Sequence, residues 1–393
     1  MTKIKTAWAA HGLSWVDHIS IARFTMFYGS KFAVRPFALV ERLDLALFRY
    51  LLVLLFPAAT AAAFFLSGVL TFLPAIIFFG LVSLLELFVQ PDRANLSDDR
   101  KRDRANARIF DGLLYSLALI QFGLLVMFLA TISRVPVASI EFVGRVLSMG
   151  MMCGLLGINL GHELGHRAGA LPRRIAEFAL LTSLENHFMP YHNLGHHRNA
   201  ATPGDPATAR RGESVYAFWF RSQIGSYIEA WQIESGRLKK RGMRIVSIRN
   251  RMLVYTIAQI GLLAVILAEF GVEALGAFIA AAVIGKILLE TANYIEHYGL
   301  LRRKLANGRY ERVGPEHSWN SDHPISRAVL FELSRHSDHH FIASKHFQVL
   351  DSLPTSPQLP TGYPGMMLLS LVPPLWFRVM DRRIDRLPQN AGN

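Results

Sequence analysis

The chain has 393 residues, of which 51% are hydrophobic and only 18% are charged, and its formal net charge is +13. Such an apolar composition excludes an ordinary soluble enzyme and indicates a protein with several membrane-spanning helices. A single cysteine, Cys153, excludes an intramolecular disulfide and a cysteine-ligated metal or iron–sulfur centre. The basic residues flank apolar segments, which favours contact with a lipid bilayer and argues against nucleic acid as a partner.

The N-terminal residues differ in character from the rest of the chain. They carry scattered charges and lack the clean apolar run of a cleavable signal peptide. The stretch from Ile19 to Val34 has the apolar and basic mixture of a segment that lies flat on a membrane surface. We therefore expect an N-terminal, interfacial segment over 1–45 and a single membrane domain over 46–393.

Six apolar runs follow, each near the length of about 20 residues that a helix needs to cross a bilayer. They cover 47–67, 69–90, 112–133, 141–161, 252–270 and 273–294. A further apolar stretch, 366–380, is too short to span and is broken by Pro373 and Pro374, so we expect it to pack on the bundle or to lie at the membrane interface. The predicted fold class is an all-α integral membrane protein with six transmembrane helices.

The loops between these runs differ in charge. Six lysines and arginines lie between the second and third runs, whereas the first-to-second and fifth-to-sixth connections carry none. Because basic loops stay in the cytoplasm, this pattern places both termini there. It also places 162–250 and the chain after 295 in a cytoplasmic, histidine-rich cap.

Nine histidines gather in four short stretches of this cap. The stretches are H-E-L-G-H-R with His162 and His166, Y-H-N-L-G-H-H-R with His192, His196 and His197, N-Y-I-E-H-Y-G with His297, and L-S-R-H-S-D-H-H with His336, His339 and His340. Residues at i and i+4 lie on one helix face, so His162 and His166 can share a metal ion. Ionisable residues at the membrane edge are costly and mark functional sites, so four such stretches on one face indicate a metal centre.

The number of imidazoles bears on the number of metal ions. A zinc site takes at most four protein ligands, so nine histidines suit two metal ions. Imidazole ligation is typical of iron, copper, zinc and nickel. H-E-L-G-H alone also matches the motif of zinc metalloproteases, but that function leaves the other stretches unexplained. A metal carrier or sensor would instead place its histidines along a pore through the spans.

Further segments carry a family resemblance beyond the histidines. They are A-T-P-G-D-P-A-T-A-R-R-G-E-S (201–214), P-E-H-S-W-N-S-D-H (315–323) and S-P-Q-L-P-T-G-Y-P (356–364). With the four histidine stretches, they resemble the integral-membrane alkane monooxygenase family, within the membrane desaturase–hydroxylase superfamily. The resemblance covers about residues 85–380. Tyr191, Arg167 and Ser334 stand where the family usually has Glu, Lys and Gln, and none of these departures removes a histidine.

The resemblance implies a non-haem centre of two Fe ions held by the nine histidines. It implies hydroxylation of the terminal carbon of medium-chain n-alkanes to 1-alkanols with O2, and electrons from rubredoxin and its reductase. It also implies a multi-pass protein of the bacterial inner membrane, where a basic cytoplasmic face would suit an acidic electron carrier. His187, His317, His323 and His346 are expected to lie outside the ligand set.

Metal-bound imidazoles usually donate their second N–H to a carboxylate or a carbonyl. The candidate carboxylates are Glu163, Glu185, Asp205, Glu296 and Asp338. Alternative functions within the same superfamily are a membrane hydroxylase of alkyl-aromatic or terpene methyl groups and a fatty-acyl desaturase.

Overall fold

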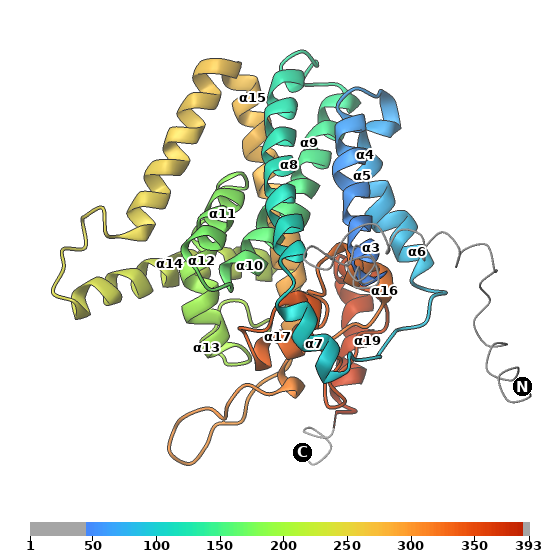
Figure 1. The fold of residues 1–393 in the computed structure, drawn as a ribbon, viewed down its shortest axis with the longest axis vertical. Helices are drawn as coiled ribbons and strands as arrows, with labels where there is room; N and C mark the ends of the chain where they lie inside the picture. Colours follow the sequence, from blue (N-terminus) through green and yellow to red (C-terminus); the bar gives the residue numbers. More distant parts are fainter. Residues whose placement is uncertain (1–44, 388–393) are drawn as a thin grey trace, which may run out of the picture. The chain divides into compact units, whose positions relative to one another are not determined.

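The computed structural model describes residues 45–387, and within that range every regular element is a helix (Figure 1). Two isolated β-bridges, Lys304–Tyr310 and Asn320–Gln358, are the extended pairings in this part of the chain. The chain divides into a unit of residues 1–48 and a unit of residues 49–393. The interfacial segment predicted over 1–45 lies outside the described residues, save for its last position.

Four helices of the described chain are long and apolar enough to cross a membrane. They are Gly68–Leu85 (η2, α5, η3 and α6), Arg108–Ile132 (α8), Ile140–Gly165 (α9, η4 and α10) and Arg251–His297 (α15). A shorter apolar helix covers Phe48–Ala63, where the sequence predicts a longer span over 47–67. The predicted runs at 112–133 and 141–161 correspond to α8 and to the helix that ends at Gly165.

The two predicted spans 252–270 and 273–294 are the two arms of α15. Gly271 separates them with φ of 83° and ψ of 176°, and the helix turns back at this end (Figure 1). That backbone conformation is essentially restricted to glycine. A Cβ atom at Gly271 would meet no atom within 4 Å, so backbone strain rather than crowding requires glycine here.

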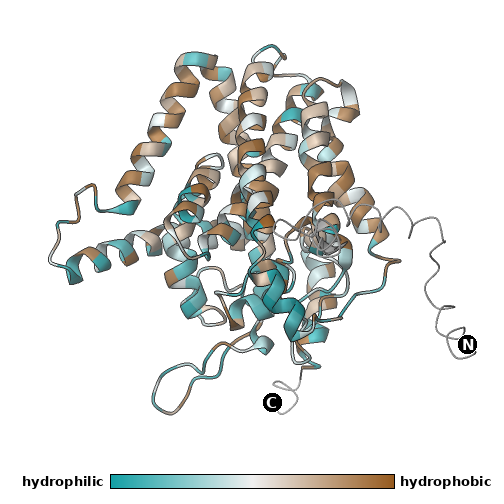
Figure 2. Cartoon of the chain, in the orientation of Figure 1, coloured by the Kyte–Doolittle hydropathy of each residue, from teal (hydrophilic) through white to brown (hydrophobic). Residues whose placement is uncertain are grey.

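Hydrophobic residues predominate along these helices, whereas hydrophilic residues gather at the end of the bundle away from the turn of α15 (Figure 2). Leu119 and Val272 are each 71% exposed and Ile260 is 60% exposed. Large apolar side chains in such exposed positions are typical of surfaces that face lipid.

The polar end is built from further helices, most of them short. They are α7 (Asp98–Ala105), α11 (Ala170–Leu181), α12 (Phe188–Tyr191), η5 (His192–His196), α13 (His197–Asn199), α14 (Val215–Lys240), η6 (Pro315–His317), α16 (Pro324–Val329), α17 (His336–Phe341), η7 (Phe347–Val349), α18 (Tyr363–Ser370) and α19 (Pro373–Ile384). The stretch 366–380 packs on the bundle as predicted, because the buried Trp376 lies 5.1 Å from the Tyr294 ring.

Small residues bring the helix Ile140–Gly165 close to the second arm of α15. A Cβ atom on Gly285 would lie 2.5 Å from Cβ of Cys153, and one on Gly150 would lie 2.6 Å from Ile284. Close approach at small residues is a common way to pack membrane helices. It fixes the two helices whose polar ends carry His162 and His297.

Candidate metal centre

All nine predicted histidines converge at the polar end of the bundle. The segments that carry them are α10 with its C-terminal cap, η5, α13, the end of α15, and α17. His166 and His197 are half-buried, and the other seven are buried.

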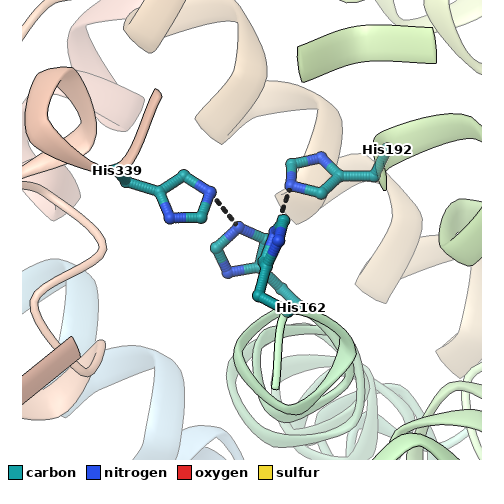
Figure 3. A group of neighbouring side chains, drawn as sticks. His162, His192 and His339 are labelled. Atoms are coloured by element: carbon teal, nitrogen blue, oxygen red, sulfur yellow. Dashed lines mark hydrogen bonds between the residues drawn. The ribbon is translucent and has the colours of Figure 1, made fainter. Parts of the chain in front are cut away.

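Eight of these histidines form two groups, and within each group the ligand atoms lie within 4.8 Å of one another. The first group is His162, His166, His192 and His339, and the second is His196, His297, His336 and His340. Figure 3 shows three members of the first group, whose rings come from different segments and point toward one another. His162 and His166 both belong to the first group.

His197 joins the first group through its contacts. Its Nε2 atom lies 3.0 Å from Nε2 of His192 and 3.1 Å from Nε2 of His339. Its ring also lies 4.6 Å from the ring of His340 in the second group. His197 therefore stands between the two groups.

The Nε2 contacts fit metal ions better than hydrogen bonds. Each of the nine Nε2 atoms lies 3.0–3.2 Å from another, and the first group with His197 forms a chain of five atoms joined by four such contacts. Each nitrogen carries one N–H or one lone pair, so five atoms can form at most two hydrogen bonds. Nitrogens bound at about 2.1 Å to one metal ion, at right angles, lie about 3.0 Å apart. The donor set therefore fits a dinuclear metal site.

A π-helical turn distributes the second histidine stretch between the groups. η5 (His192–His196) has this wider geometry, and η4 (Cys153–Ile158) precedes His162 in the same form. His192 belongs to the first group and His196 to the second. Such turns are frequent at functional sites because they redirect side chains.

Asp205 is the predicted carboxylate that orients a histidine. Its Oδ2 atom lies 2.9 Å from Nδ1 of His196 and accepts a hydrogen bond from Thr208 at 2.7 Å. The Tyr191 hydroxyl donates to Oδ1 at 2.7 Å, so the family departure at this position completes the same network. Burial raises the pKa of Asp205, but His196 and these hydrogen bonds outweigh it and lower the pKa to about 2.

Glu163 and Asp338 have other contacts. Glu163 accepts two hydrogen bonds from Arg167, at 3.0 and 3.2 Å. Asp338 accepts from Lys345 and from the backbone N–H of Asp351, the latter at 2.7 Å. In these contacts both carboxylates bind basic side chains or backbone N–H groups, and neither accepts a hydrogen bond from an imidazole.

Glu185 and Glu296 also depart from the expected role. Glu185 pairs with His187 and Lys286, each at 3.1 Å, and so holds a histidine outside the two groups. Glu296 lies 3.4 Å from Nε2 of His336, the nitrogen that faces the site, instead of its Nδ1 atom. Within residues 45–387, His187, His317, His323 and His346 belong to neither group and, unlike His197, do not stand between them.

Arg335 is a feature that the sequence prediction missed. It is 3% exposed and immediately precedes His336, the first residue of α17. Its guanidinium contacts Asp322 at 3.2 Å and donates to the carbonyl oxygens of Leu350 at 2.6 Å and Asp92 at 3.2 Å. Arg335 thereby connects the segments around Asp92, Asp322 and Leu350 to the start of α17, which carries three histidines.

Glu332 extends this network on the other side. It accepts hydrogen bonds from Arg327 at 2.7 Å and from the Tyr50 hydroxyl at 2.9 Å, and it pairs with Arg49. Burial raises the pKa of Glu332, but the surrounding guanidinium groups outweigh it and lower the pKa. The sequence signal was the charge pattern of Arg327, Glu332 and Arg335 between two histidine stretches.

An apolar cavity reaches the histidines from within the bundle. Its apolar walls include Leu155, Ile158, Leu288, Leu289 and Ala292. His162, His192, His336 and Glu296 border the same cavity. A lining of this kind suits a hydrophobic molecule whose end meets the dinuclear site.

Comparisons with known proteins agree with this site. A family model described as fatty acid desaturase matches residues 140–370. The chain is 38% identical to the alkane 1-monooxygenase of Ectopseudomonas oleovorans over 350 residues, which cover 88% of this chain and 87% of that protein. It is 41% identical to alkane 1-monooxygenase 1 of Alcanivorax borkumensis over 310 residues, or 79% and 76% of the two chains.

A more distant relative has a different substrate in its name. The chain is 31% identical over 245 residues to the xylene/toluene monooxygenase hydroxylase component of Pseudomonas putida, which covers 62% of this chain and 64% of that protein. The resemblance predicted from the histidine stretches is confirmed, and the chain belongs to the alkane 1-monooxygenase family, within the wider family of fatty acid desaturases.

Proposed function

We propose that this protein is an alkane 1-monooxygenase that converts medium-chain n-alkanes to 1-alkanols at a centre of two non-haem iron ions. The observation that carries the proposal is the junction of the two histidine groups with an apolar cavity. When bound, the iron ions supply the activation of O2. An alkane offers no polar group, so the cavity walls must orient it by shape alone.

The ligand assignment follows the two groups. One iron would be held by His162, His166, His192, His339 and His197, and the other by His196, His297, His336 and His340, as the two groups and the contacts of His197 support. Asp205 orients the His196 ring, and the buried surroundings exclude bulk water from the site.

The reaction needs a supply of electrons and protons. One oxygen atom enters the terminal C–H bond and the other leaves as water, with the uptake of two electrons and two protons. The sequence has no flavin, nicotinamide or haem motif, which supports an external donor, and we assign that role to rubredoxin with its reductase.

The membrane arrangement completes the proposal. We place 46–393 as one domain in the bacterial inner membrane, with six spans, both termini and the metal centre on the cytoplasmic side. The break of α15 at Gly271 supports the count of six, and the basic residues between the second and third spans support the orientation.

A methyl group on an aromatic ring is a second candidate substrate. The identity with the xylene/toluene monooxygenase component favours it. The cavity walls carry aliphatic side chains together with Phe78 and Phe188, so they suit either substrate, and competition between octane and toluene separates the two. An alkene product would instead indicate a desaturase.

The first prediction concerns metal content and product. Protein purified in detergent is expected to contain two irons per chain and little zinc, and to form 1-octanol from octane with rubredoxin, reductase and O2. Iron and zinc are measured together by mass spectrometry, and the product by gas chromatography. One zinc per chain without iron would contradict the proposal.

The second prediction concerns the cavity wall. Ala292→Leu is expected to lower the ratio of dodecane to octane hydroxylation about tenfold, because added methyl groups in a hydrophobic pocket discriminate at that scale. The ratio is measured with both alkanes in one mixture. Ala280→Leu is the matched control, since Ala280 lies exposed on the same arm of α15. Equal ratios in the two variants would show that the cavity does not hold the chain.

A further inference from the structure

A hairpin over residues 300–314 leaves the metal centre directly after α15. Its two limbs are joined by the Lys304–Tyr310 bridge and by the hydrogen bond from the N–H of Leu305 to the carbonyl of Arg309, at 2.7 Å. Gly308 turns the tip with φ of 78°. In Figure 1 the hairpin is the orange loop that projects from the end opposite the turn of α15. These internal bonds join its two limbs.

The surface of this hairpin is strongly basic. It carries Arg302, Arg303, Lys304, Arg309 and Arg312 against the single acid Glu311, a formal charge of 5 − 1 = +4. Arg303 pairs with Glu311 at 3.0 Å, yet its side chain remains 83% exposed. The positive charge is therefore presented to solvent.

Exposed apolar side chains lie among these charges. Leu301 is 52% exposed, Leu305 is 43% exposed and Tyr310 is 37% exposed, all at the polar end of the protein. Arginine and tyrosine are enriched in protein–protein interfaces, and apolar side chains form the centre of such contacts. A loop whose basic residues served only to orient the protein in the membrane would not require these three exposed apolar side chains.

The base of the hairpin touches segments next to the proposed ligands. The backbone N–H of Arg302 donates to the carbonyl of Ala201 at 2.8 Å, and its guanidinium donates to the carbonyl of Arg198 at 2.8 Å. Arg198 is exposed and follows His197, and the hairpin itself follows His297 by a few residues. The hairpin is thus connected to His197 through the hydrogen bond to Arg198, and to His297 through the chain itself.

We propose that the 300–314 hairpin, together with Arg198, is the docking surface for the acidic electron carrier. This inference rests on the proposed function, which requires such a carrier. Opposite charge steers the encounter and aligns the two proteins, while the apolar side chains allow a small, transient contact. An anionic membrane surface is the other partner of suitable charge, but the hairpin projects away from the apolar helices (Figures 1 and 2).

The test reverses two charges on the hairpin. Lys304→Glu combined with Arg309→Glu is expected to raise the KM for reduced rubredoxin, and its Kd for the detergent-solubilised protein, about tenfold. The kcat at saturating rubredoxin, the iron content and the rate with dithionite and methyl viologen are expected to stay unchanged. The matched control is Lys240→Glu with Arg241→Glu, an identical charge change on exposed residues at the far end of α14.

Four other outcomes are decisive. Equal rises in KM for the hairpin variant and the control would reduce the effect to overall charge and overturn the docking surface. Unchanged KM and Kd, with weaker binding of the hairpin variant to phosphatidylglycerol vesicles, would show that the hairpin binds the membrane surface. That result would also overturn the docking surface. A loss of the methyl viologen-driven rate would overturn it by locating the damage in the metal centre. Absent alkane oxidation by the unmodified protein would contradict the proposed function, whereas a selective rise in Kd would still support the docking surface.

Discussion

His196→Ala is expected to reduce alkane hydroxylation by more than about 100-fold and to lower the bound iron, because loss of an outer partner of a ligand already costs 10–100-fold. His196 links the second histidine group to Asp205, since its Nε2 atom lies 3.2 Å from that of His340 and its Nδ1 atom lies 2.9 Å from Asp205. Octane turnover and iron per chain, measured on the same folded preparation, test this expectation.

A graded pair of variants separates a ligand from its support. Asp205→Asn keeps the shape of the side chain but removes the charge that holds the His196 ring, so activity is expected to fall 10–100-fold with part of the iron retained. His346→Asn is the control, because His346 lies outside both histidine groups. If His196→Ala lost no more iron than His346→Asn, His196 would not be a ligand.

The convergence of the nine histidines at one end of the bundle was predictable because two independent patterns agree on it. The apolar spans predict where His162 and His297 leave the membrane, and the clustering of the remainder predicts a shared site. Their division into two groups was not predictable from spacing. His192 and His196 are four residues apart, which on an α-helix would direct both to one face, but the π-helical turn of η5 sends them to different groups.

The carboxylate partners show a second limit of local pattern. Glu163 is adjacent to His162 in sequence, but neighbouring helical positions face apart, and the Glu163 side chain turns to Arg167. Asp205 reaches His196 across nine residues because the chain between them folds back, and hydrogen bonds from Tyr191 and Thr208 hold the Asp205 carboxylate. Such contacts depend on loop conformation, which apolar periodicity does not describe.

The helix boundaries divide in the same way. The turn at Gly271 was predictable, since glycine separates two runs of suitable length and the structure uses its positive φ. The predicted first span, 47–67, is longer than the observed helix, because the helix ends at Ala63 while apolar residues continue to Leu66. A run of apolar residues can continue past the end of a helix, so hydrophobicity alone does not show where the backbone changes direction.

Arg335→Met is expected to destabilise the folded protein by about 3–5 kcal/mol, the scale at which removal of one partner from a buried ion pair acts. Asp322 is 1% exposed and would lose its partner, and the carbonyls of Leu350 and Asp92 would lose buried donors. The variant is expected to unfold at a markedly lower temperature in detergent. Because α17 begins at His336, the folded fraction is also expected to bind less iron.

Arg335→Lys distinguishes charge from geometry at the same position. Lysine restores the positive charge but cannot direct a planar fork of donors to three separate acceptors, so it is expected to recover only part of the lost stability. Arg102→Met is the matched control, since Arg102 pairs with Asp99 on the surface, where both side chains are more than three-quarters exposed, and such pairs contribute about 0–1 kcal/mol. Full recovery by lysine would assign the effect to charge alone. Equal unfolding temperatures for Arg335→Met and Arg102→Met would show that the network does not hold α17 in place.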